Sequence, residues 1–351
     1  MQNNKDHIVR IDQHARVALK ALDVLPDKVS RTLFVIDEKE KLVGTLTDGD
    51  IRRGLLSGFE ISQPISVFMN TEFKYLKNSE DNLELIKKFR HLDISLVPLI
   101  DDDRNLLEIL DLKQIRTLLP VTALIMAGGR GERLKPLTDL SPKPMLKVGD
   151  KPILEHNIDR LISFGVSDIY ISVKYMKDQI MDYFGNGESK GVKITYVEED
   201  VPLGTLGALS LIEKLEHDDI LVMNSDLLTN IDFEDFFNFY KSESATMALA
   251  SIPYVVSIPY AVIQTDHHKV QSFSEKPSYT YYSNGGIYLM SGKLKNLLIR
   301  GEFFNATDLM DLVISDEELS LVHYPLLGYW LDIGKHQDFI KAQEDIKHIT
   351  F

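Results

Sequence analysis

The sequence predicts an α/β protein with two domains, a smaller one over residues 1–118 and a larger one over residues 121–351. Three observations support this expectation. The chain has 351 residues, a length typical of two domains. Its first third contains an internal repeat, and the remainder alternates between apolar strands and helices. We therefore expect a small α/β pair, followed by an α/β domain whose mostly parallel mixed sheet is wound by helices.

The repeat in the first third has an offset of 64 residues and needs no gap. Phe34-Val35-Ile36-Asp37 aligns with Pro98-Leu99-Ile100-Asp101, and Leu42-Val43-Gly44 aligns with Leu106-Leu107-Glu108. We expect each copy to form a helix, a strand, an acidic turn, a second strand and a second helix. The two copies should pack together, because neither buries enough apolar surface alone.

The first copy contains the motif "LVGTLTDGDI", which resembles the cystathionine-β-synthase (CBS) domain, a unit that occurs in tandem pairs. The resemblance implies that Thr47 and Asp50 contact the ribose and phosphate of an adenine nucleotide. The second copy departs from the motif at three positions, where Gly44, Thr47 and Asp50 are replaced by Glu108, Asp111 and Gln114. The alternative is a structural pair that mediates dimerisation, in which Asp50 only caps a helix.

The larger domain begins with Val121–Met126, an apolar segment expected to be a buried parallel strand. Ile153–Phe164 has apolar residues at helical spacing, and Gly165 follows as a cap. We expect further strands at residues 168–175, 192–199 and 219–226, and helices at residues 177–184 and 205–215. Shorter strands and hairpins follow residue 245, one of them turning at residues 265–268. Ligands of such a sheet bind at the carboxyl ends of the strands.

A loop rich in glycine and positive charge follows the first of these strands, and residues 124–144 read "LIMAGGRGERLKPLTDLSPKP". Its glycines let the backbone approach a ligand and present N–H groups to anions, and Arg133 and Lys143 add positive charge. Neither a Walker G-K-[ST] nor the dinucleotide G-x-G-x-x-G spacing is present. The loop predicts a polyphosphate site; the alternative is a glycine turn with solvated cations.

Two aspartates follow apolar segments that should end at the same edge of the sheet. Asp226 closes the strand "DILVMNSD", and Asp332 follows the aromatic–apolar run in "YWLDIG". Two carboxylates that converge on a phosphate site suit Mg²⁺, which prefers oxygen ligands. Either aspartate alone is more typical of a cap or a turn.

Together these motifs resemble the signature of sugar-1-phosphate nucleotidyltransferases. The pattern "AGGRGERLKPLT…PKPML" is followed in order by "NSD", "SEKP", "NGGIY" and "WLDIG", over roughly residues 121–345. The resemblance implies a magnesium-dependent reaction that joins a nucleoside triphosphate to a sugar-1-phosphate and releases pyrophosphate. The sugar phosphate attacks the α-phosphorus in line, so catalysis needs positioning and charge neutralisation rather than a protein nucleophile.

The same resemblance implies a role for each motif residue. Arg133 would hold the β- and γ-phosphates, and Lys143 would contact the α-phosphate or the incoming phosphate. Magnesium would be held by Asp226 and Asp332. The residues expected in the nucleotide-binding loop are Ala127, Gly128, Gly129 and Gly131.

On the sugar side, the resemblance implies that Lys276 binds the sugar phosphate and that Glu275 accepts hydrogen bonds from sugar hydroxyls. The alternative for these two residues is a surface ion pair. The sugar pocket would be lined by Asn284, Gly285 and Gly286, with Thr307 and Asp308 at its rim. Ala261 stands where the family often has glycine, which would narrow that pocket.

The segment "VEEDVPLGTLGAL" aligns with the base-contacting loop of the family and includes Gly204 and Thr205. Members that use uracil or thymine tend to have glutamine where Glu199 stands. A carboxylate only accepts hydrogen bonds, which matches the N1–H and N2–H₂ donors of guanine. We therefore predict GTP as the substrate, with Glu198 as the base contact if the register is off by one. A thymidylyl- or uridylyltransferase is the alternative.

A CBS pair ahead of such a domain resembles the guanylyltransferases that make GDP-glucosamine for bacterial legionaminic acid synthesis. This favours glucosamine-1-phosphate as the sugar, with mannose-1-phosphate second. The chain ends within a helix after Asp332, which disfavours an appended acetyltransferase domain. The alternative to an enzyme is a non-catalytic protein that senses nucleotides. It is disfavoured because all four key charged residues are present: Arg133, Lys143, Asp226 and Asp332.

The composition excludes several classes of function. The formal net charge of −14 argues against nucleic acid or an anionic membrane surface as the main partner. Without cysteine, the chain has no disulfide, thiol nucleophile or thiolate metal site. No apolar run approaches the ~20 residues of a membrane span, and the first residues do not resemble a signal peptide. We expect a cytoplasmic protein that assembles as a homo-oligomer.

Overall fold

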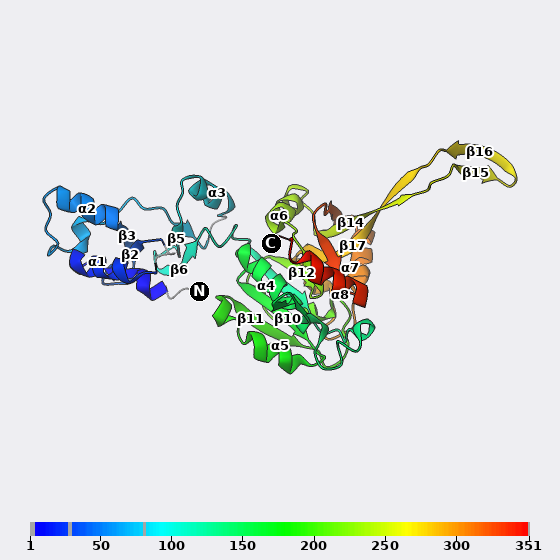
Figure 1. Cartoon of the computed structure of the whole chain (residues 1–351), viewed down its shortest axis with the longest axis horizontal. Helices are drawn as coiled ribbons and strands as arrows, with labels where there is room; N and C mark the ends of the chain where they lie inside the picture. The colour runs from blue at the N-terminus through cyan, green and yellow to red at the C-terminus, as the bar shows by residue number, and fades with distance from the viewer. Residues whose placement is uncertain (1–3, 27–29, 80–81, 350–351) are drawn as a thin grey trace. The chain divides into compact units, whose positions relative to one another are not determined.

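The computed structural model describes residues 4–26, 30–79 and 82–349, and its chain forms two compact units (Figure 1). The first unit comprises residues 1–119 with the short segments 163–165 and 189–191. The second comprises residues 120–162, 166–188 and 192–351. Both units combine strands and helices, so the predicted α/β class is confirmed.

The first unit contains two three-stranded sheets, one from each copy of the repeat. In the first copy, β1 (Ile8–Arg10) pairs in parallel with β2 (Thr32–Ile36), which is antiparallel to β3 (Leu42–Thr47). The second copy repeats this topology with β4 (Leu76–Lys77), β5 (Leu96–Ile100) and β6 (Leu106–Asp111). The helices of this unit are α1 (Ala15–Val24), α2 (Asp48–Leu56) and α3 (Leu83–His91), and the 3₁₀ turns are η1 (Asn4–His7) and η2 (Ile65–Val67).

The two copies match in detail at the offset expected from the sequence. The pairing of Thr32 with Thr47 in the first copy corresponds to the pairing of Leu96 with Asp111 in the second. Both hairpins also have a register shift at the same place, just before their last residue pair. Glu40 and Arg104 both adopt left-handed backbone angles at the equivalent turn position, with φ of 62° and 64°. Residues of both copies form one buried apolar cluster, so the copies pack together as predicted: Phe34, Leu42, Leu96 and Ile100.

The copies differ after their third strand. In the first copy, Thr47 caps α2 and Asp50 completes a capping box. In the second copy, the predicted helix is absent, and residues 112–114 form a turn closed by hydrogen bonds to the Asp111 side chain. Gln114 lies where Asp50 lies in the first copy and offers no carboxylate to the cap. Pro120 follows within a few residues and directs the chain into the next strand.

The second unit is built on a seven-stranded sheet with the order β11-β10-β7-β12-β17-β14-β18. Only β17 runs against its neighbours, so the sheet is mixed and mostly parallel, as predicted. The central strands are apolar runs buried on both faces, as parallel strands usually are. Their bounds are β7 (Val121–Met126), β10 (Asp168–Val173), β11 (Lys193–Glu198), β12 (Asp219–Asn224), β14 (Met247–Ser257), β17 (Ser278–Ser291) and β18 (Leu321–Pro325).

Helices and short strand pairs surround this sheet. The helices are α4 (Ile153–Ser163), α5 (Lys177–Phe184), α6 (Phe233–Ser242), α7 (Ala306–Ser315) and α8 (His336–Asp345). The 3₁₀ turns are η3 (Glu132–Leu134), η4 (Lys143–Met145), η5 (Glu188–Lys190), η6 (Gly207–Leu211) and η7 (Gly292–Leu297). Besides the hairpin of β15 (Val262–Asp266) and β16 (Lys269–Ser274), two short antiparallel pairs lie outside the main sheet: β8 (Lys147–Val148) with β9 (Lys151–Pro152), and β13 (Leu227–Thr229) with β19 (Trp330–Asp332).

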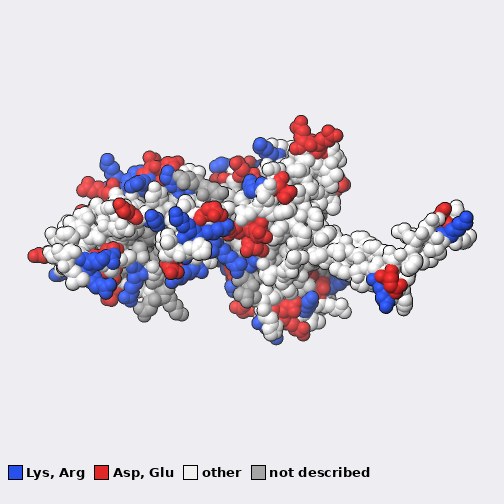
Figure 2. All heavy atoms as spheres, turned by 90° about the horizontal axis from the view of Figure 1, so that it is seen from above, with Lys and Arg blue, Asp and Glu red and all other residues white. Residues whose placement is uncertain are grey.

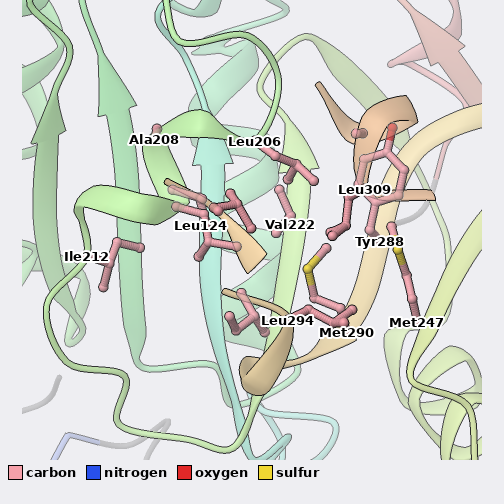
Figure 3. Close-up of a cluster of buried hydrophobic side chains, with 14 of the residues drawn as sticks. Leu124, Leu206, Ala208, Ile212, Val222, Met247, Tyr288, Met290, Leu294 and Leu309 are labelled. Carbon is pink, nitrogen blue, oxygen red and sulfur yellow. The ribbon is translucent and has the colours of Figure 1, made fainter. Parts of the chain in front are cut away.

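One face of the sheet forms a large apolar core (Figure 3). Leu124 of β7 and Val222 of β12 pack with Leu206 and with Leu309 of α7. The helix predicted at residues 205–215 is reduced to η6, because the amides of Leu206 and Gly207 bond to the carbonyl of Phe304 instead of to a helical turn. This contact fixes the segment that follows β11 against the segment that precedes α7.

β14 and β17 continue beyond the sheet as a two-stranded arm, which we define as residues 252–284. The arm ends in the predicted hairpin, β15 (Val262–Asp266) and β16 (Lys269–Ser274), which turns at His267 and His268. Figure 1 shows the arm projecting from the rest of its unit. No side chain of residues 252–284 is buried.

None of the helices in the described part of the chain is both long and apolar enough to cross a membrane.

Candidate functional site

A pocket of about 810 Å³ opens at the carboxyl ends of β7, β10, β11 and β12. This is the edge at which parallel α/β sheets bind ligands. Seven residues singled out from the sequence line it: Gly128, Gly129, Lys143, Glu199, Gly204, Thr205 and Asp226. The structure therefore brings the glycine loop, the "PLGT" segment and one predicted metal ligand to a single cavity.

The glycine loop begins where β7 ends, and the buried Ala127 is held by a bond of 2.9 Å from its amide to the Ser172 carbonyl. Gly131 has a φ of 64°, and a Cβ there would lie 2.8 Å from the Cβ of Lys143. Glycine is therefore required for the turn and for the close approach of the lysine. The Thr138 hydroxyl donates to the Gly131 carbonyl at 2.9 Å and fixes the loop from its other side.

Lys143 is a buried cation that faces two carboxylates. Its Nζ donates to Oδ2 of Asp226 and lies 3.8 Å from Oδ1 of Asp332. The strand pair β13–β19 brings the two aspartates together, because Asp226 immediately precedes β13 and the amide of Ile333 donates to its carbonyl at 3.0 Å. Lys143, Asp226 and Asp332 thus form one charged cluster, although 189 residues of sequence separate its ends.

Each of these carboxylates keeps an oxygen that could bind a cation. Oδ1 of Asp226 and Oδ1 of Asp332 are buried and accept no hydrogen bond from any residue that the structure describes. Burial and the neighbouring Asp226 raise the pKa of Asp332 above its ordinary value of 3.8, against the opposing charges of Lys143 and Arg133. Carboxylate oxygens without donors fit a hard divalent ion such as Mg²⁺. Among residues 4–26, 30–79 and 82–349 no group of three or more His, Cys, Asp or Glu could hold a metal, so further ligands would come from phosphate and water.

The positive charges of the pocket are more numerous than the sequence motifs indicated. Arg133 does not line the cavity but lies beside Asp332, close enough to lower the pKa of that carboxyl. Arg130 does line it, with its guanidinium 5.8 Å from the ring centre of Tyr175. Lys174 also lines it and donates to the Asp200 carbonyl at 2.7 Å. Sequence reasoning missed Lys174, although it directly follows β10, the same signal that identified Asp226 after β12.

The structure separates the two glutamates considered for base recognition. Glu199 is buried and lines the pocket, where Oε1 accepts from the Ser172 hydroxyl and Oε2 accepts from the Leu203 amide at 3.0 Å. Glu198 instead is exposed and forms an ion pair with Lys177. Each oxygen of Glu199 retains a second lone pair for a ligand. The internal bonds hold its carboxylate in a fixed orientation at the pocket wall.

The "PLGT" segment closes another side of the pocket. Gly204 has a φ of 77°, and a Cβ there would lie 2.6 Å from the Phe304 carbonyl oxygen. The Thr205 hydroxyl accepts from the Ala306 amide at 2.6 Å and ties the segment to the start of α7. Asp308 forms a capping box with Asn305, which lines the pocket, whereas Thr307 is exposed.

The "NGG" segment lies at the base of the arm, close to the charged cluster. The Asn284 side chain accepts from the Gly286 amide at 2.9 Å, and the Trp330 indole donates to the Gly285 carbonyl at 2.9 Å. A Cβ on Gly286 would lie 2.6 Å from Nδ2 of Asn224, a residue that lines the pocket. Gly286 of the predicted sugar pocket therefore borders the cavity through Asn224.

Glu275 and Lys276 are not brought to this site. They lie between β16 and β17 on the arm, and both are exposed. Neither forms an ion pair or a hydrogen bond with any residue that the structure describes, so the surface ion pair considered from the sequence is absent.

In the CBS segment, Thr47 and Asp50 are already bonded to each other. The Thr47 amide donates to Oδ2 of Asp50 at 2.8 Å, and Oδ1 of Asp50 pairs with Arg53 at 2.5 Å. This is the helix-capping arrangement considered as the alternative. Binding of an adenine nucleotide by these residues stays a prediction.

Comparison with known proteins matches the second unit and the first copy of the repeat in the first unit. The nucleotidyl transferase family model matches residues 122–349, and the CBS domain model matches residues 5–57. The chain is 32% identical over 228 residues to a mannose-1-phosphate guanyltransferase of Debaryomyces hansenii, covering 62% of each chain. It is 29% identical over 231 residues to the mannose-1-phosphate guanylyltransferase of Mycobacterium tuberculosis, covering 64% of each. The chain thus spans less than two thirds of the length of these curated relatives.

Solved structures show the same fold in the second unit. HddC from Yersinia pseudotuberculosis is 27% identical, with a TM-score of 0.51 and coverage of 64% of this chain and 99% of that one. The same protein complexed with GMP-PN gives 26% identity and a TM-score of 0.50. Because the family model covers more than half of its length, including the glycine loop, both aspartates and the "NGG" segment, the chain belongs to the nucleotidyl transferase family and carries a CBS domain ahead of the matched region.

Proposed function

We propose that the protein is a sugar-1-phosphate nucleotidyltransferase that transfers GMP from GTP to a sugar-1-phosphate and releases pyrophosphate. The observation that carries this proposal is the cluster of Lys143, Asp226 and Asp332 at a pocket bordered by the glycine loop. Positive charge, carboxylate oxygens that accept no hydrogen bond from a described residue, and the backbone of the glycine loop meet there. Such a set suits the transfer of a phosphate group between two anionic substrates.

In the proposed reaction, a non-bridging oxygen of the sugar phosphate forms a bond to the α-phosphorus of GTP. The bond from that phosphorus to the β-bridging oxygen breaks, and pyrophosphate leaves with the electron pair. No protein base is needed, because the attacking phosphate is already ionised at neutral pH. The chain's own contribution is to orient the α-phosphate with Lys143 and the glycine-loop amides, while Arg133 offsets charge on the leaving pyrophosphate.

The cofactor is proposed to be magnesium, held by Asp226 and Asp332. The two buried oxygens without hydrogen-bond donors support this assignment. When bound, the ion would supply positive charge that offsets the charge on the reacting phosphates.

The base is proposed to be guanine, recognised by Glu199. Three observations support this choice: the carboxylate lines the pocket, Ser172 and Leu203 fix its orientation, and it can only accept hydrogen bonds. The relatives named as mannose-1-phosphate guanylyltransferases and the neighbour crystallised with GMP-PN are consistent with it.

Two sugars are candidates. The CBS domain ahead of the transferase fold supports glucosamine-1-phosphate, as in the enzymes of legionaminic acid synthesis that the sequence resembles. The names of the relatives support mannose-1-phosphate. A substrate panel decides between them.

The decisive experiment is to measure pyrophosphate release with GTP, ATP, UTP or dTTP combined with glucosamine-, mannose- or glucose-1-phosphate. The assays contain either MgCl₂ or EDTA, and the Asp226→Asn variant serves as the inactive control. We expect release with GTP and one sugar phosphate, only with Mg²⁺ present. No release from any pair would contradict the proposed function and favour a nucleotide-sensing role.

A further inference from the structure

The arm of residues 252–284 exposes an apolar surface that its own unit does not cover. Ten large apolar or aromatic side chains on it are at least 36% exposed, among them Tyr260 at 76% and Phe273 at 70%. Only four charged residues lie between residues 254 and 282, namely Asp266, Lys269, Glu275 and Lys276. Figure 2 shows few charged side chains along the visible face of the arm. An apolar patch of this extent is typical of a protein interface.

The arm also carries the two sugar-side residues that the pocket lacks. Ser278 pairs with Ser257 near the outer end of the ladder, and the ladder continues without interruption to Asn284 at its base. Eight residues of extended strand separate Ser278 from Gly286, a span of roughly 26 Å. Lys276 lies still further out than Ser278, so one sugar phosphate beside Gly286 and Asp226 cannot also contact the Lys276 of its own chain.

Two features make it unfavourable for the arm to fold back onto its own pocket. Seven consecutive residue pairs, from Ser251–Asn284 to Ser257–Ser278, hold it as a regular ladder that bending would disrupt. Bending would also leave the outward apolar face of the ribbon in water. A second copy of the chain could cover this surface and leave the ladder intact.

We propose that two copies of the chain exchange arms, so that Lys276 and Glu275 of one copy complete the sugar-phosphate side of the other copy's pocket. This inference rests on the proposed function, because it assigns the origin of a substrate contact. Exchange of an identical element between protomers is a low-cost route to a dimer.

The size and the chemistry of the arm fit this occupant. Ten side chains that are each more than one third exposed amount to roughly 1,000 Å² of apolar surface, comparable to the ~800 Å² per partner in a stable complex. Lys276 has a φ of 43°, a costly conformation for a residue other than glycine. Strain of this kind clusters at ligand contacts, and here it holds the lysine at the junction between the tip hairpin and the ladder.

The test is complementation between two variants that are each inactive. Lys276→Ala removes the arm contact, and Asp226→Asn disables the pocket. The two full-length variants are co-expressed with different affinity tags, and the species carrying both tags is isolated. In an arm-exchanged dimer, one of the two sites combines an intact pocket with an intact arm, so the mixed dimer should recover about half of the wild-type turnover per dimer. A mixed species no more active than its parents would overturn the proposal.

Three controls keep the outcome interpretable. Lys269→Ala, which removes the other lysine of the arm, should retain wild-type turnover, whereas full activity of Lys276→Ala would contradict the assigned contact. Light scattering should show a dimer for the wild type and a monomer for the double variant Phe273→Ser/Tyr281→Ser, whose side chains are exposed and whose fold is checked by circular dichroism. A monomeric wild type refutes arm exchange. Absence of pyrophosphate release by the wild type with every substrate pair would instead refute the proposed function.

Discussion

The nucleotide side and the sugar side of the proposed site differ in how their side chains are held. On the nucleotide side, Glu199 accepts bonds from Ser172 and Leu203, and Lys143 is buried against Asp226. On the sugar side, Glu275 and Lys276 are exposed on the arm, without an ion pair or hydrogen bond to any described residue. The fold therefore preorganises the nucleotide side, which reduces the entropy lost in ordering its side chains in the transition state. The sugar-side residues need a further element to bring them to the pocket.

The largest loss of turnover is expected from changes to the charged cluster of Lys143, Asp226 and Asp332 on the nucleotide side. Asp226→Asn and Asp332→Asn should each lower turnover at least ~100-fold, because each weakens the binding of the metal that offsets transition-state charge. The matched control is Asp139→Asn, which changes an exposed aspartate of the glycine-loop region and should retain wild-type turnover. Steady-state kinetics at one fixed Mg²⁺ concentration, chosen to saturate the wild type, measure all three. More than half the wild-type rate in either cluster variant would remove that residue from the metal site.

Base choice tests whether the fixed carboxylate is selective. The wild type should prefer GTP over ATP and UTP by at least ~100-fold in kcat/KM, or roughly 2.7 kcal/mol, because adenine places an acceptor where guanine N1–H donates. Glu199→Gln should erode this preference, mainly through lost GTP activity. The variant should also gain some activity with UTP or dTTP, since an amide can also donate hydrogen bonds.

Glu198→Gln is the matched control for base choice, because Glu198 is adjacent in sequence but exposed and paired with Lys177. Its selectivity should equal that of the wild type when all four triphosphates are compared under one set of conditions. A wild-type preference for UTP or dTTP would refute the guanine assignment. A changed preference in Glu198→Gln alone would move the base contact to that residue.

The two arginines of the glycine loop should differ by a smaller factor. Arg133→Ala should lower kcat by roughly 10- to 100-fold, because it removes charge next to Asp332 that is needed for the leaving pyrophosphate. Arg130→Ala should act mainly on the KM for GTP, and by less than about 10-fold, because Arg130 lines the pocket beside Tyr175. Separate kcat and KM values distinguish the two effects. Equal losses of kcat would show that the roles in the loop are assigned wrongly.

The smallest effect concerns the stability cost of the charged cluster. The pKa of Asp332 is raised in the folded protein, so its ionised form lowers the free energy of unfolding at pH 7. Without Mg²⁺, Asp332→Asn should therefore raise Tm by about 1 °C, a modest gain because the side chain is partly exposed. The gain should be complete above the raised pKa and vanish below the unfolded value of about 4. Thermal unfolding between pH 4 and 8 measures it, with the exposed Asp150→Asn as control; a lower Tm at pH 7 would contradict it.

Much of the fold followed from local sequence patterns. The repeat was visible as matching apolar positions, and its strand registers and left-handed turns recur at the same offset in the structure. The failures lie where tertiary contacts replaced local ones. Residues 205–215 have helical spacing, but the amides of Leu206 and Gly207 bond to Phe304. Where the last helix of the second copy was expected, the amides of Arg116 and Leu119 bond to the carbonyls of Ser163 and Phe164.

By itself, the sequence determined the family, the positions of the main strands along the chain and the residue types of the charged cluster, because these depend on local periodicity and on short motifs. Only the tertiary structure decided which of those residues meet. The β13–β19 pair brings Asp226 and Asp332 together, and burial selects Glu199 over Glu198 as the pocket residue. The tertiary structure likewise places Glu275 and Lys276 on an exposed arm. Motif spacing indicates which functional residue types occur and in what order along the chain. Which of these residues lie close together depends on long-range strand pairing, and local sequence does not specify the paired strands.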